Sequence, residues 1–99
     1  MEDVTYAAET HRMHGQVLLH AGAGRAAATA ALLRALDVAR AQQALSWELR
    51  AACDLARLWA EDGERQRALD LLAPVHGRFT EGFGTEDVLG AARLVDALR

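Results

Sequence analysis

Three amino acids, lysine, isoleucine and asparagine, are absent from this 99-residue chain, and only 5% of its residues are aromatic. The residues that are abundant, alanine, leucine and arginine, all favour helices, whereas β-branched residues are scarce. The composition therefore predicts an all-α protein. Because arginine is the only strongly basic residue used, its presence at any one position reflects the composition of the whole chain and does not by itself indicate a recognition site.

Other absences exclude whole classes of function. The chain has no basic run and a net charge of −3, so nucleic acid is not an expected partner. The single cysteine, Cys53, cannot form an internal disulfide and fits a reducing compartment. The first ten residues lack a signal-peptide pattern, and the apolar stretch 16–39 is interrupted by His20, Arg25 and Arg34. We therefore expect a soluble, cytoplasmic protein that does not contact a membrane.

Apolar residues recur at helical spacing along the chain and almost never alternate as they would in a strand. We expect one domain over 1–99 that contains five antiparallel helices, at about 3–21, 25–43, 46–62, 64–79 and 85–99. Ser46 and Thr85 are suitable N-caps for the third and fifth helices, and Gly63 is a suitable stop for the third.

The pattern within these helices also predicts how they pack. The third helix is apolar on two sides, so it should lie between neighbours at the centre. Pro74 should kink the fourth helix, which would continue to Phe79 and end at a left-handed cap at Gly82. The core-facing stripe of the first helix is expected at Tyr6, Thr10, Met13, Val17 and Ala21.

Two segments of the chain, 11–36 and 50–75, repeat one pattern of small and large residues about 40 residues apart. The matched positions are Gly15 and Ala56, Leu18 and Trp59, Gly22 and Gly63, Ala28 and Ala68, Leu32 and Leu72, and Ala35 and Val75. This pattern resembles a long-period tetratricopeptide repeat. The resemblance implies two and a half repeats of helical hairpins: one over 3–43, one over 46–80, and a terminal capping helix over 85–99.

The segment 46–98 carries a closer resemblance. It contains SWELRAACDLARL, then an acidic turn with glycine, then LLAPVHGRFTEGFGTED. These motifs resemble the C-terminal repeats of large bacterial regulators that carry an ATPase module and often an adenylate-cyclase-like domain. The chain departs from that family at His76 and Arg78, where tyrosine and tryptophan are usual. Because it has no G-x-x-x-x-G-K-[ST] phosphate loop, the resemblance implies a scaffold that senses or docks and has no ATPase activity.

No group of residues in the sequence indicates a catalytic, cofactor or metal site. His11 and His14 share one side of a helix at a spacing that metal ligands use, but no third ligand lies near them. Cys53 lies among alanines, where a small buried thiol is a simpler interpretation than a nucleophile. The glycines at 22 and 24 precede a helix but follow no strand, unlike a phosphate loop. We therefore expect a protein that is not an enzyme and uses no cofactor.

The functional prediction comes from the resemblance to tetratricopeptide arrays, in which the first helix of each pair lines a concave surface. The outward positions expected on that surface include Glu9 and Cys53, and the predicted partner-binding residues among them are Arg12, Gln16, His20, Arg50, Arg57 and Glu61. Their arginines would form a basic strip suited to an acidic peptide or protein partner, although they also fit ordinary solvated side chains. We expect a non-catalytic protein-interaction or sensor module of a bacterial regulatory system. The alternative is a structural module that forms homo-oligomers through Leu94, Val95 and Leu98 of its terminal helix.

Overall fold

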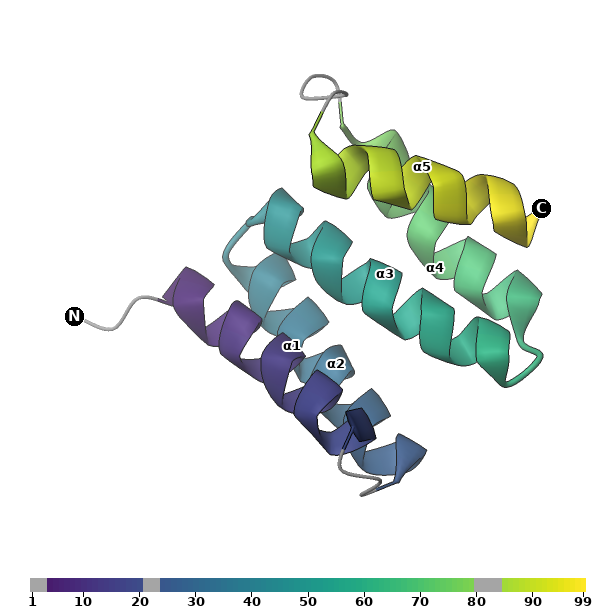
Figure 1. Cartoon of the computed structure of the whole chain (residues 1–99). Coiled ribbons are helices and arrows are strands. Elements are labelled where there is room, and N and C mark those ends of the chain that lie inside the picture. The colour runs from purple at the N-terminus through teal and green to yellow at the C-terminus, as the bar shows by residue number, and fades with distance from the viewer. Residues whose placement is uncertain (1–3, 21–23, 80–84) are drawn as a thin grey trace.

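The computed structural model describes residues 4–20, 24–79 and 85–99, and this part of the chain forms five α-helices (Figure 1). The helices are α1 (Val4–His20), α2 (Arg25–Ala41), α3 (Leu45–Glu61), α4 (Arg65–Gly77) and α5 (Glu86–Leu98). These described ranges contain no strand, so the all-α prediction is confirmed. None of their helices combines the length and apolar character that crossing a bilayer requires.

The helices are arranged around α3. Helices α1, α3 and α5 run in one direction, and α2 and α4 return in the other (Figure 1). Helix α3 packs against each of the other four helices, which confirms its predicted central position. Its two apolar sides are buried accordingly, as Leu49 and Leu55 illustrate. Helix α1 packs mainly on α2 and also touches α3.

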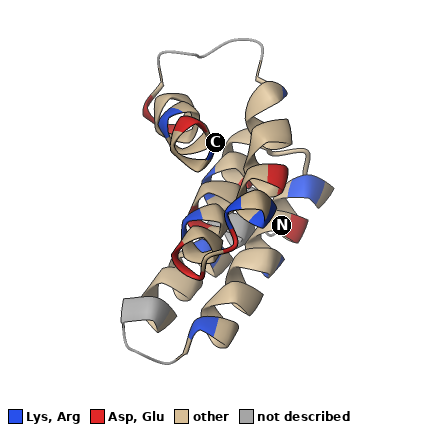
Figure 2. Ribbon diagram, turned by 90° about the vertical axis from the view of Figure 1, so that its right-hand side faces the viewer, with Lys and Arg blue, Asp and Glu red and all other residues tan. Residues whose placement is uncertain are grey.

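The core consists mainly of leucine and alanine. The largest apolar side chains that are fully buried are Leu32, Leu49, Leu55 and Leu72. Burial of each is worth about 1.5–3 kcal/mol relative to exposure. Alanines without exposed surface, including Ala28, Ala52, Ala56, Ala68 and Ala91, lie among them. Small residues of this kind let helix axes approach closely. Charged residues of both signs are intermixed along the helices (Figure 2).

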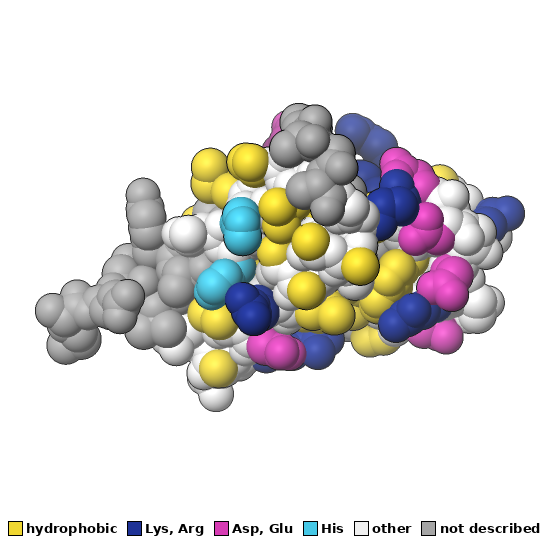
Figure 3. All heavy atoms as spheres, turned by 90° about the horizontal axis from the view of Figure 1, so that it is seen from below, with side chains coloured by type: hydrophobic (Ala, Val, Ile, Leu, Met, Phe, Trp, Pro, Cys, Tyr) yellow, Lys and Arg dark blue, Asp and Glu magenta, His cyan; other side chains and the backbone are white. Residues whose placement is uncertain are grey.

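The core-facing side of α1 differs from the predicted stripe. Met13 and Val17 are 55% and 62% exposed, and Thr10 is exposed as well. Gly15 is buried instead, and a Cβ added there would lie 3.1 Å from Leu32 Cγ. Hydrophobic side chains remain at the surface on the lower face of the molecule (Figure 3). The side chains of Tyr6 and Ala21 lie outside the described residues.

The stripe prediction was wrong because a glycine makes no contribution to a hydrophobic pattern. Helix α1 contacts α2 through Gly15, the small position of the repeat, and this close approach turns Met13 and Val17 outward. The repeat pattern was therefore a better guide to packing than the period of apolar residues.

Two of the predicted helix ends agree with the structure. Gly63 follows α3 with a φ of 83°, a conformation that favours glycine. Thr85 is the N-cap of α5, and its Oγ1 accepts a hydrogen bond of 3.5 Å from the Val88 amide. Helix α4 contains Pro74 and extends three residues beyond it.

Two other helix ends were predicted wrongly. Helix α3 begins at Leu45, so Ser46 lies in its first turn and Ala44 is the N-cap. Helix α2 ends at Ala41, and Gln43 just after it has a φ of 56° that turns the chain. Helix α3 can therefore begin earlier than the sequence predicted. Helix α4 ends at Gly77, and Phe79 packs on the core beyond that end. The proposed cap, Gly82, lies outside the described residues.

A buried carboxylate joins three segments at one end of the bundle. Glu48, in the first turn of α3, is 2% exposed. Its two oxygens accept hydrogen bonds from Arg78 at 3.0 and 3.1 Å, and Oε2 also accepts one from Arg40 at 3.1 Å. These ion pairs connect the last turn of α2 and the residue after α4 to the start of α3. Residue 78 is usually tryptophan in the family that residues 46–98 resemble. The arginine found here has a clear structural role, because it pairs with the buried Glu48.

Loss of both arginines should destabilise the fold strongly, because it would leave a charged carboxylate buried without a partner. We expect Arg40→Ala with Arg78→Ala to lower the free energy of unfolding by about 3 kcal/mol or more. Each single substitution should cost less, since one arginine remains. Urea denaturation followed by circular dichroism would measure these values. Arg34→Ala, an exposed arginine on α2, is the control and should change stability little.

Two glycine-to-alanine substitutions should have opposite effects. A Cβ at Gly15 would lie 3.2 Å from the backbone oxygen of Ala28, so Gly15→Ala must push α1 away from α2 and should cost about 1 kcal/mol or more. A Cβ at Gly90 meets nothing within 4 Å. Gly90→Ala should therefore stabilise α5 by about 0.5–1 kcal/mol. Thermal denaturation of the pair tests the close approach, which a rise in melting temperature for Gly15→Ala would contradict.

Candidate binding pocket

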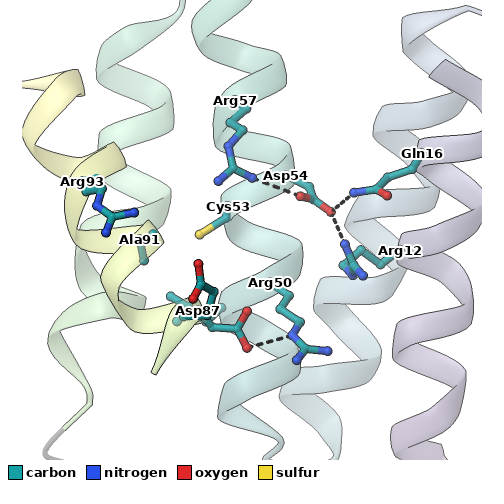
Figure 4. Close-up of a pocket in the computed structure, with 12 residues that line it drawn as sticks. Arg12, Gln16, Arg50, Cys53, Asp54, Arg57, Asp87, Ala91 and Arg93 are labelled. Atoms are coloured by element: carbon teal, nitrogen blue, oxygen red, sulfur yellow. Dashed lines mark hydrogen bonds and ion pairs between the residues drawn. The ribbon is translucent and has the colours of Figure 1, made fainter. Parts of the chain in front are cut away.

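A concave pocket of about 530 Å³ lies between α1, α3 and α5 (Figure 4). Residues at helical spacing on one face of each helix form its walls. They are Arg12 and Gln16 from α1; Leu49, Arg50, Cys53, Asp54 and Arg57 from α3; and Glu86, Asp87, Gly90, Ala91 and Arg93 from α5. The three helices that run in the same direction thus present one shared surface (Figure 1).

Four of the residues predicted from sequence line this pocket: Arg12, Gln16, Arg50 and Arg57. Glu61 does not. It lies one turn beyond Arg57, at the end of α3, where it pairs with Arg25 at 3.3 Å. The side chain of His20 lies outside the described residues.

Sequence reasoning missed Asp54, which organises the α1 side of the pocket. Its Oδ2 accepts hydrogen bonds from Arg12 at 2.8 Å and from Gln16 at 2.9 Å. Its Oδ1 lies 3.4 Å from Arg57. The Asp54 side chain is only 12% exposed, so these charged hydrogen bonds hold α1 against α3 in a partly enclosed setting. Its place on the same helix face as Arg50 and Arg57 was the available signal.

The α5 wall of the pocket was also missed, because α5 was expected only as a capping helix. Arg50 donates a hydrogen bond of 2.9 Å to Asp87, which joins α3 to α5. The Arg50 guanidinium also stacks over the Trp47 ring at 5.0 Å. Arg50 is therefore held in place, and its replacement would alter the attachment of α5 as well as the pocket surface.

The electrostatic character of the pocket differs from the basic strip that the sequence suggested. Four arginines and three carboxylates line it, which leaves one net positive charge. Asp54 and Asp87 together engage Arg12, Arg50 and, at longer distance, Arg57. A broadly basic surface for a polyacidic partner is therefore absent from the described pocket.

Cys53 contributes an apolar part of the pocket floor. Its side chain is 7% exposed and points from α3 toward α5 (Figure 4). Burial raises the pKa of the thiol from 9.0 to about 11, and the nearby Arg57 only partly opposes this effect. The thiol is therefore protonated near neutral pH, where a nucleophile would need the thiolate.

The described residues contain no group of three or more histidine, cysteine, aspartate or glutamate side chains arranged to hold a metal ion. Comparisons of the chain with protein-family models, curated proteins and solved structures found no match.

The raised pKa of Cys53 should appear in its alkylation by iodoacetamide. In the folded chain the rate should rise about tenfold per pH unit up to pH 10, because the thiolate fraction is still growing. In the urea-unfolded chain the rate should level off near pH 9. By linkage, the stability present below pH 9 should fall as the pH rises from 9 to about 11. A plateau near pH 9 in the folded chain would contradict this assignment.

Proposed function

We propose that this chain is a non-catalytic protein-interaction module that binds a peptide segment in the pocket between α1, α3 and α5. The observation that carries the proposal is the make-up of the pocket. Side chains from three parallel helices line it, and most of them are polar: arginines, a glutamine and carboxylates surround Leu49, Cys53 and Ala91, which are almost completely buried beneath them. These polar groups can donate and accept hydrogen bonds that fix the orientation of an extended peptide.

The internal repeat supports the same interpretation. The small positions of the two copies, Gly15 and Ala56, are both buried, and α1 packs on α2 as α3 packs on α4. This agrees with the resemblance to tetratricopeptide repeats, where the first helix of each pair faces the concave side. A regulatory role in a bacterium is proposed only from the resemblance of residues 46–98.

The alternative, self-association through the terminal helix, has less support. Val95 and Leu98 are buried in the core of the chain itself, and Leu94 packs against the same core. These side chains are therefore not available to a second copy unless α5 detaches.

A bulky residue in the pocket should block peptide binding. Peptides would be selected from a random ten-residue display library with the wild-type chain, and their affinities measured by fluorescence anisotropy. We expect Gly90→Trp to weaken binding at least tenfold, because Gly90 lines the pocket and its Cβ position is open. Tenfold corresponds to about 1.4 kcal/mol of binding free energy.

The matched control is Gly77→Trp, since Gly77 is also helical, is exposed and has nothing within 4 Å of its Cβ position. It should bind the selected peptides with wild-type affinity. Circular dichroism should show that both variants are folded. Equal affinity of the two variants would exclude the pocket as the binding site and overturn the proposed function.

A further inference from the structure

The unsatisfied charges of the pocket have opposite signs at its two ends. Arg57 of α3 and Arg93 of α5 reach into the hollow on either side of Cys53 (Figure 4). Glu86 lies in the first turn of α5, next to Asp87, which pairs with Arg50 at the other end. Because α3 and α5 run in the same direction, later positions on both helices lie at the same end (Figure 1). At one end the available groups are therefore Arg57 and Arg93, and at the other end, where Arg50 pairs with Asp87, the available group is Glu86.

The interactions within the chain leave specific groups available to a ligand. Asp87 is engaged by Arg50, and Asp54 Oδ2 by Arg12 and Gln16. Neither Glu86 nor Arg93 has an ion-pair partner in the ranges that the structure describes, and Arg57 has only the 3.4 Å contact with Asp54. A carboxylate and a guanidinium that both line one pocket thus retain their full capacity to bind opposite charge.

The spacing of these two positions along α5 fits an extended peptide. Glu86 and Arg93 lie seven positions apart on one face of α5, which corresponds to about 10 Å along the helix axis. A peptide in the polyproline II conformation rises about 3.1 Å per residue and returns to the same face every three residues. Side chains three positions apart in such a peptide are therefore separated by a similar distance, with small residues between them over the Cys53 floor.

From this arrangement we infer that the pocket recognises a peptide with charges of both signs. Arg57 and Arg93 bind an acidic side chain, and Glu86 binds a basic side chain three positions away. The inference rests on the proposed function and specifies the charge of its peptide partner, which carries one acidic and one basic side chain. A second acidic residue in place of the basic one would approach Glu86 and be repelled, because Arg50 at that end is already paired with Asp87.

The experiment uses peptides selected from the random library whose binding is lost in Gly90→Trp. Their enriched sequences should pair an acid with a base three positions away. Replacing the basic residue of such a peptide with glutamine should weaken binding to the wild-type chain about threefold to tenfold, the range of a partly exposed ion pair. The same replacement should have no effect on binding to Glu86→Gln. Replacing the acidic residue should weaken binding to the wild-type chain but have much less effect on Arg57→Gln with Arg93→Gln.

Two controls lie outside the pocket. Asp96→Asn removes an exposed carboxylate from the same helix as Glu86, and Arg34→Gln removes an exposed arginine from α2. Both should bind the peptides as the wild-type chain does. Pocket-dependent peptides without a basic residue, or a basic residue whose effect persists in Glu86→Gln, would overturn the bipolar assignment and leave the proposed function intact. Failure to obtain any peptide that depends on the pocket would overturn both.

Discussion

The first turn of α3 fixes the positions of its neighbours, and Glu48 is its central residue. The Glu48 carboxylate is almost completely buried. Unless a positively charged side chain pairs with it, its burial costs a large desolvation free energy. Arg40 and Arg78 supply that pairing from two other segments. Two residues later Arg50 binds Asp87 on α5. One turn of one helix therefore anchors the end of α2, the end of α4 and the start of α5, and with them one side of the pocket.

The ion pairs of Glu48 differ from the other ion pairs because the Glu48 carboxylate is buried. The pairs that join Arg25 to Glu61 and Arg67 to Glu64 are exposed on both sides, and such pairs contribute at most about 1 kcal/mol each. Asp54 lies between the two extremes and determines where α1 sits on α3. The specific arrangement of this alanine-rich bundle therefore depends on ion pairs between arginines and carboxylates of different helices, and not on the number of arginines.

Sequence reasoning recovered the helices and the central position of α3, since both depend on the period of apolar residues along one segment. It failed for Met13 and Val17 because the packing surface of α1 is made by Gly15, a residue with no side chain to detect. Arg12, Arg50 and Arg57 were predicted from outward helix positions and the resemblance to tetratricopeptide arrays, whereas Arg93 was missed. Asp54 was missed although it shares a helix face with Arg50 and Arg57. Asp87 was missed because pairing between helices depends on how far one helix is shifted along another, which no local pattern records.

The ion pairs of Asp54 and Asp87 also affect the free energy with which the proposed peptide would bind. Side chains that Asp54 and Asp87 already hold lose little further freedom when the pocket is occupied, so they shape the walls at low entropic cost. Arg93 and Glu86 must be ordered by the ligand, and each can return at most a modest ion-pair energy at the rim. Leu49, Cys53 and Ala91 are almost completely buried, so apolar contact adds little, and the proposed peptide must be held mainly by hydrogen bonds and by the charges of Glu86 and Arg93. A small pocket on a chain of this size is suited to selective and readily reversible contact.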